Sequence, residues 1–175
     1  MNYKNYFKSF KLPNKIKILG IFLITILIVL NSSLSYSQNE QTNTDFDLLR
    51  KKLISYNFTV KLEIPPHTNK YGIKPYGLLE GETKTIWINP VVFELENAEA
   101  TIVHEATHAA QLCAGKTEFK TLKLDIDPPR ITHPYFMRYH NYRREIEAEA
   151  YTVQVQKNSL ELANELLDLH CSSID

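Results

Sequence analysis

The run from Ala98 to Gly115, AEATIVHEATHAAQLCAG, constrains the fold of this chain more than any other segment. Asn97 is suited to cap the start of a helix and Gly115 to follow its end, so the pattern predicts one helix over these residues. Most of its residues are apolar, and its several alanines allow neighbouring elements to pack closely. We therefore expect this helix to lie in the core.

Three polar residues interrupt this apolar helix. His104 and His108 are four positions apart, so they project from the same face and both imidazoles can reach one metal ion. Glu105 is placed to meet a metal-bound water rather than the metal. Zinc lowers the pKa of such a water, and a carboxylate acting as general base completes a nucleophile for attack on a carbonyl. The alternative is an ordinary helix with two half-exposed histidines.

A catalytic zinc usually has three protein ligands, and a second helix offers candidates for the third. This helix is predicted over residues 134–157, with Pro134 in its first turn. At 100° per residue its apolar face consists of Tyr142, Ile146, Ala150 and Val153. Glu145 and Glu149 border that face, whereas Glu147 is predicted to point towards solvent. One of the bordering glutamates would bind the metal and the other would accept the outer N–H of a ligating histidine.

Together the two helices resemble the gluzincin group of zinc metallopeptidases, in which a His-Glu-x-x-His helix is completed by a glutamate from a downstream helix. The matching segments are HEATH, residues 104–108, and EIEAEA, residues 145–150. The resemblance implies that the zinc ligands are His104, His108 and Glu145. It also implies that Glu105 is the general base and that Glu149 supports a ligand, with Glu147 a rival to Glu145. The strand TKTIWIN, residues 83–89, would be the edge strand that aligns a peptide substrate.

A peptidase also needs a donor for the developing oxyanion. The segment HPYFMRYHNYRR supplies five candidates, of which Tyr139 and His140 lie nearest to Glu145. The full set is His133, Tyr135, Tyr139, His140 and Tyr142. Aromatic residues at helical spacing are more often part of the core, and that is the alternative for each.

The remaining patterns predict a small sheet and two more helices. We expect a helix over residues 45–57, a strand over 58–64, a hairpin of 77–80 with 83–89, and a last helix over 160–170. The segment 120–127 is a candidate for a further short strand. The fold class is therefore α+β, with a short antiparallel sheet, an active-site helix and further C-terminal helices, and the resemblance implies a small zincin-like domain.

The N-terminal segment indicates export. A Lys-rich stretch precedes an apolar run over residues 18–30, which is typical of a signal peptide and short for a membrane span of about 20 residues. We predict that residues 1–37 are a signal peptide or an N-terminal membrane anchor, and that residues 38–175 form the exported domain, periplasmic, extracellular or anchored facing outward. The membrane is a partner only through this segment, if it is not cleaved.

Two further observations limit the partners. The chain has 20 Lys and Arg residues against 20 Asp and Glu residues, which gives no electrostatic argument for a nucleic-acid partner. Its two cysteines, Cys113 and Cys171, can form one disulfide in an oxidising compartment or remain as buried thiols. The oligomeric state is not indicated.

These patterns together predict an exported zinc-dependent peptidase that hydrolyses a peptide or protein substrate. One alternative is a catalytically inactive domain that keeps the metal for stability and binds peptide in the same groove. The other is a metal-free, membrane-tethered helical adaptor. Other amides remain candidate substrates, because the same zinc and water chemistry hydrolyses them.

Overall fold

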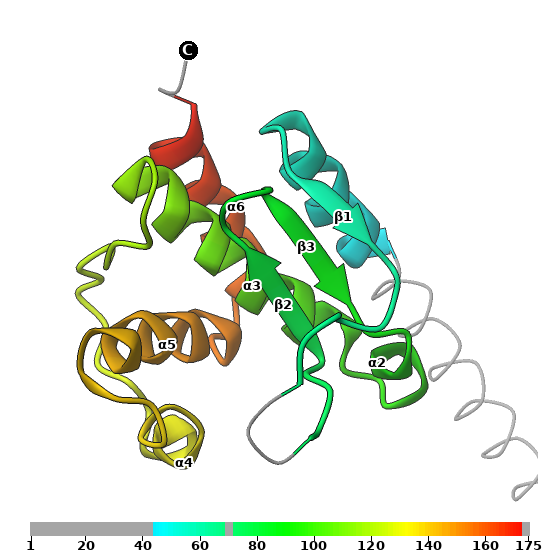
Figure 1. The fold of residues 1–175 in the computed structure, drawn as a ribbon. Helices are drawn as coiled ribbons and strands as arrows, with labels where there is room; N and C mark the ends of the chain where they lie inside the picture. The colour runs from blue at the N-terminus through cyan, green and yellow to red at the C-terminus, as the bar shows by residue number, and fades with distance from the viewer. Residues whose placement is uncertain (1–43, 69–71, 173–175) are drawn as a thin grey trace, which may run out of the picture. The chain divides into compact units, whose positions relative to one another are not determined.

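The structure is a computed structural model that describes residues 44–68 and 72–172. Its sheet has three strands in the order β1-β3-β2 (Figure 1). They are β1 (Thr59–Lys61), β2 (Gly77–Glu80) and β3 (Thr85–Ile88). β2 and β3 form the predicted antiparallel hairpin, whereas β1 pairs in parallel with β3, so the sheet is mixed rather than antiparallel.

The prediction that the strand within residues 83–89 is an edge strand is wrong. β3 pairs on both sides and is the central strand, with Ile86 and Ile88 fully buried. Among the described strands, β2 pairs with β3 alone, so the free edge on that side of the sheet belongs to β2. In Figure 1, β2 is the strand that faces α5. A hairpin pattern identifies two neighbouring strands, but the strand that joins them from elsewhere in the chain decides which one becomes central.

The helices follow the predicted order with one interruption. The first helix covers residues 44–55, and the predicted helix over Ala98–Gly115 is confirmed as α3. The others are α2 (Val91–Glu94), α4 (His133–Phe136), α5 (Asn141–Gln154) and α6 (Ser159–Cys171), with a short 3-10 helix, η1 (Arg130–Thr132). The single helix expected over 134–157 is thus two helices, α4 and α5. Asn141, at the start of α5, has a φ of 44°, which no continuous right-handed helix contains. Residues 120–127 form no strand.

α3 lies in the core, as predicted. Every residue from Thr101 to Cys113 except His104 is buried, because this helix packs against α6, α5, β2 and β3. The described part of the domain is therefore an α+β arrangement in which the sheet and the C-terminal helices share one central helix (Figure 1).

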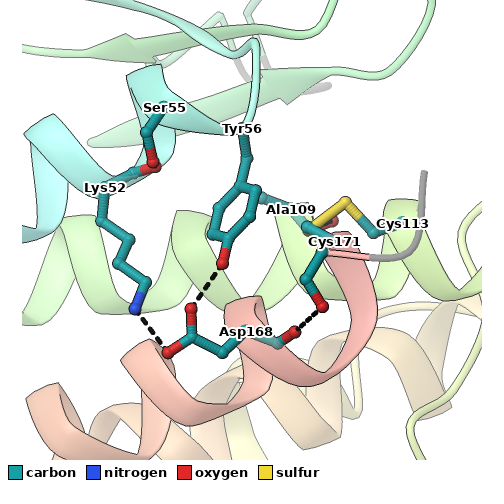
Figure 2. Close-up of a disulfide and its surroundings, with 8 residues drawn as sticks. Lys52, Ser55, Tyr56, Ala109, Cys113, Asp168 and Cys171 are labelled. Atoms are coloured by element: carbon teal, nitrogen blue, oxygen red, sulfur yellow. Dashed lines mark hydrogen bonds and ion pairs between the residues drawn. A yellow bond between two sulfur atoms is a disulfide. The ribbon is translucent and has the colours of Figure 1, made fainter. Parts of the chain in front are cut away.

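The C-terminal helix is tied to its neighbours by covalent and polar contacts (Figure 2). Cys113, near the end of α3, and Cys171, in the last turn of α6, form a disulfide, which decides between the bridge and the free thiols. Asp168 on α6 accepts hydrogen bonds from Lys52 and Tyr56, which belong to the first helix and the turn after it. The disulfide thus joins α6 to α3, and the Asp168 contacts join α6 to the first helix and the turn after it.

The predicted signal peptide or anchor lies outside the described residues. Within 44–68 and 72–172, the helices are too short or too polar to cross a membrane.

Candidate metal centre

The two histidines of α3 point their ring nitrogens at the same position. The Nε2 atoms of His104 and His108 are 3.1 Å apart, because the residues are one helical turn apart on one face. His108 is buried and His104 is half-buried, so bulk water has little access to the space between the two rings. The sequence prediction that both imidazoles reach one point is therefore confirmed.

A carboxylate from α5 completes the cluster, and it belongs to Glu147. Its Oε2 atom lies 3.5 Å from the Nε2 of His104 and 3.8 Å from the Nε2 of His108. These three residues are the group that could hold a metal ion among the described residues. Tetrahedral ligands at 2.0–2.1 Å from zinc lie about 3.3 Å from one another. The three separations are close to that value.

The prediction that Glu145 faces the histidines is wrong, as is the prediction that Glu147 faces solvent. Glu147 is only 6% exposed, whereas Glu145 is exposed and lies beside residues 121–128. Tyr142, which was assigned to the buried face, is also 53% exposed. The packing of α5 against α3, α4 and α6 therefore buries Glu147, which the apolar pattern of α5 alone does not indicate.

The outer nitrogens of both histidines are held by glutamine side chains. His104 Nδ1 lies 3.0 Å from Oε1 of Gln154, and His108 Nδ1 lies 2.7 Å from Oε1 of Gln111. Because an amide oxygen only accepts, each Nδ1 carries the proton and each Nε2 keeps its lone pair. Two lone pairs facing each other and a carboxylate repel one another unless a cation lies between them. The donor set therefore fits a metal ion.

Glu149 contacts His108 through Gln111 and not directly as had been predicted. It was expected to accept the outer N–H of a histidine directly. Instead its Oε2 accepts from Nε2 of Gln111, which also donates to the carbonyl oxygen of Ile146. The same carboxylate accepts the backbone N–H groups of Leu122 and Lys123, each at 2.8 Å. Glu149 thus connects α5, the loop after α3 and the amide that orients His108.

Glu105 lies between α3 and β2, and it is 4% exposed. The backbone of β2 approaches so closely that a Cβ atom at Gly77 would lie 2.4 Å from Oε1 of Glu105. The backbone N–H of Leu79 also faces this carboxylate. Its other oxygen, Oε2, is buried without a hydrogen-bond partner among the described residues. An acceptor without a donor in a buried site is suited to receive a proton from a bound molecule.

The ionisable groups of this cluster shift one another's pKa values. Burial raises the pKa of Glu105, and the imidazoles of His108 and His104 only partly offset this effect. Burial alone would also raise the pKa of Glu147, but the neighbouring imidazoles of His104 and His108 hold it well below its usual range. Burial acts to lower the pKa of His108, yet the Glu147 carboxylate outweighs it and raises this pKa. Opposite pKa shifts of two carboxylates in one site are typical of two different roles, here a metal ligand for Glu147 and a general base for Glu105.

A group of basic and aromatic side chains borders the cluster, and we call it the basic rim: Arg138, Tyr139, Arg143 and Tyr151. Tyr151 was not predicted, although it is one turn after Glu147 on α5. Its ring centroid lies 4.5 Å from that of His104. Burial, followed by the charge of Glu147, raises the pKa of Tyr151 to about 12, so its phenol stays protonated near neutral pH.

Among the five predicted oxyanion donors, Tyr139 and Tyr135 lie near the cluster. Tyr139 belongs to the basic rim, and Tyr135 stacks on Tyr151. Tyr142 and His133 contact other parts of the chain: Tyr142 donates to the carbonyl of Phe119, and His133 contacts the carbonyl of Pro128. His140 is exposed at the start of α5.

Comparison of the chain with protein-family models, curated proteins and solved structures gave no match.

Proposed function

We propose that this domain is a zinc-dependent hydrolase that cleaves peptide bonds. One observation carries the proposal: His104, His108 and Glu147 converge on one point, and the unpartnered Oε2 of Glu105 lies buried on the same helix. Two imidazole nitrogens and one carboxylate oxygen form a ligand set typical of catalytic zinc. A purely structural zinc site usually has four protein ligands, and this cluster has three.

The residues of the site suit the steps of amide hydrolysis. When bound, zinc would supply an activated water and polarise the scissile carbonyl. Glu105 accepts the proton of the attacking water through its unpartnered oxygen and delivers it to the leaving nitrogen. Burial raises the pKa of Glu105 towards neutral pH, and a group that both accepts and donates a proton works best when its pKa lies near the working pH.

Tyr151 is the best placed donor for the oxyanion of the substrate. Its ring packs edge-on against His104, and its phenol stays protonated. A neutral hydroxyl in a half-buried position donates a hydrogen bond to developing negative charge more effectively than a hydrated one. Tyr139, which is half-buried in the same rim, is the second candidate.

The free edge of β2 supports a peptide as substrate. An extended peptide can pair with an exposed strand edge through main-chain hydrogen bonds. Because β2 lies against Glu105 at Gly77, a peptide on this edge would run past the general base. The disulfide between Cys113 and Cys171 supports the proposed export, since such bridges persist in oxidising compartments.

Metal analysis tests the ligand set. Purified protein is expected to bind one zinc, and Glu147→Ala should lose most of it because a buried ligand is removed. Glu145→Ala is the matched control: the same substitution, two residues away and exposed, should leave zinc binding unchanged. Equal zinc content in both variants, or loss in Glu145→Ala alone, would overturn the assignment. No zinc in the unmodified protein would favour the metal-free adaptor.

Hydrolysis of a mixed peptide library tests the catalytic step. Glu105→Gln should retain zinc and lower kcat by about 100-fold to 10,000-fold, because the amide cannot accept the proton. The measurement is product formation by mass spectrometry on both zinc-loaded proteins. Zinc binding without any cleavage by the unmodified protein would instead support the inactive, metal-stabilised peptide-binding domain.

A further inference from the structure

The basic rim brings two arginines to one side of the metal cluster. Nε of Arg143 lies 3.6 Å from Oε1 of Glu147, the carboxylate oxygen that faces away from the histidines. The guanidinium carbons of Arg138 and Arg143 lie 5.5 Å and 5.4 Å from the ring centroid of Tyr139. Both cations are thus held against the same aromatic ring.

Arg138 is close to the proposed reaction site although it contacts no ligand directly. It lies beside the phenol oxygens of Tyr139 and Tyr151, which raise its pKa against the lowering effect of burial. Tyr151 in turn packs on His104. One aromatic side chain therefore separates the guanidinium of Arg138 from a metal-ligating histidine.

The positive charge of the rim is only partly neutralised. Across the described ranges, Arg138 forms no ion pair with a carboxylate. Arg143 pairs there with one carboxylate, that of Glu147, and the other oxygen of Glu147 faces the two histidines. α5 carries no acidic residue in its first turn, so its N-terminal end adds no negative charge. Arg138 and Arg143 are both exposed, and a ligand can reach them.

We propose that Arg138 and Arg143 form a subsite that binds a carboxylate of the substrate next to the scissile bond. The inference rests on the proposed peptidase function and adds the substrate class: peptides with an acidic group at this position. Arg138 is the principal residue, because its guanidinium has no acidic partner, whereas Arg143 also compensates Glu147. The carboxylate is either the free C-terminus of a short peptide or an Asp or Glu side chain.

The position of Tyr139 supports this assignment. A guanidinium has five N–H donors, so Arg138 can lie near the Tyr139 ring and the phenol oxygens and still direct N–H groups to a carboxylate. The contact with the ring also limits the side chain's freedom before the substrate arrives, which reduces the entropy lost on binding.

The test uses sets of peptides that differ in one charge. One pair has a free or an amidated C-terminus, and a second pair has Glu or Gln beside the cleaved bond, so the two pairs distinguish the two sources of the carboxylate. The unmodified protein should show a higher kcat/KM for the acidic member of at least one pair. In Arg138→Gln this preference should fall about 10-fold through KM, with the neutral member changed less than about 2-fold.

Arg130→Gln is the matched control. Arg130 is an exposed arginine on η1 that forms no described contact with Tyr139, Tyr151 or the metal ligands, so its loss should leave the preference intact. Equal rates for the acidic and neutral peptides in the unmodified protein would overturn the proposal. An equal loss for both peptides in Arg138→Gln would do the same.

A binding measurement keeps the subsite testable even if no peptide is cleaved. Zinc-loaded full-length Glu105→Gln protein is titrated with the acidic and neutral peptides by calorimetry, with and without Arg138→Gln. Tighter binding of the acidic peptide that depends on Arg138 supports the subsite, whether or not hydrolysis occurs. Equal binding of both peptides overturns it, while absence of cleavage by the unmodified protein bears only on the peptidase proposal.

Discussion

At the scale of single residues, the site depends on one glycine that carries no chemistry. Gly77 lets the backbone of β2 lie against the carboxylate of Glu105, and its φ is not in the left-handed region. A side chain here would therefore disturb the glutamate through its volume and not through backbone strain. This makes Gly77 a positioning residue for the proposed general base.

We predict that Gly77→Ala impairs cleavage while zinc stays bound. The added Cβ would lie 2.4 Å from Oε1 and 2.8 Å from Cδ of Glu105, so the carboxylate must move. A displacement on the scale of 1 Å lowers kcat by about 100-fold in sites that depend on orientation. Hydrolysis kinetics and zinc content are measured on the same preparation.

Gly81→Ala, in the turn of the same hairpin, is the control. A Cβ there would contact the Phe119 ring at 3.3 Å and Leu112 at 3.4 Å, so it touches Glu105 not at all and reaches the metal cluster only indirectly, through the contact of Phe119 with His108. Its cleavage rate should remain close to that of the unmodified protein. If both glycine variants behave alike, the effect of Gly77 comes from the hairpin and not from Glu105.

At the scale of elements, Gln111 couples the metal helix to α5. This fully buried side chain accepts the Nδ1 proton of His108 and donates to the carbonyl of Ile146 and the carboxylate of Glu149. Ile146 directly precedes Glu147, so one glutamine fixes a proposed ligand on α3 and the backbone next to a proposed ligand on α5. Such residues behind a metal site orient the ligands and strengthen their basicity.

We predict that Gln111→Leu weakens zinc binding by about 10-fold to 100-fold, the range typical of lost support behind a ligand. The reason is that His108 loses the acceptor that keeps its proton on Nδ1. Affinity is measured by competition with a chelator at several pH values. The Gln111 hydrogen bond also raises the pKa of His108, so its loss weakens proton binding at Nε2 and the zinc-affinity defect should shrink as the pH falls.

Gln156→Leu provides the comparison for this prediction. The amide of Gln156 donates to the carbonyl of Thr152 within α5 and contacts neither histidine. Loss of zinc affinity to the same degree in both variants would show that Gln111 acts through the general stability of α5.

At the scale of the whole molecule, the disulfide joins the metal helix to the end of the described chain. Cys113 and Cys171 are 58 residues apart, so the bridge closes a loop that contains the last residues of α3 and all of α4, α5 and α6. Closing so long a loop restricts the unfolded chain strongly, and a bridge of this kind typically stabilises a domain by about 2–4 kcal/mol.

We predict that the double variant Cys113→Ala, Cys171→Ala lowers the free energy of unfolding by about 2–4 kcal/mol. Urea denaturation followed by circular dichroism measures it. A reductant should destabilise the unmodified protein by a similar amount and leave the double variant unchanged. A reductant effect of equal size on both proteins would contradict a stabilising role for the bridge.

The sequence alone determined α3, its two converging histidines and the β2–β3 hairpin, because periodicity and spacing within a few residues fix which side chains share a face. It did not determine the third ligand, the edge strand or the pairing of the cysteines. The rotation of α5 about its own axis depends on the break before Asn141 and on the packing of α5 against α3 and α6. A helical wheel drawn from the sequence includes neither of these. A rotation of α5 by less than half a turn exchanges Glu145 for Glu147. Only the tertiary structure could make that choice, since both glutamates have equal chemistry and differ only in what lies opposite them.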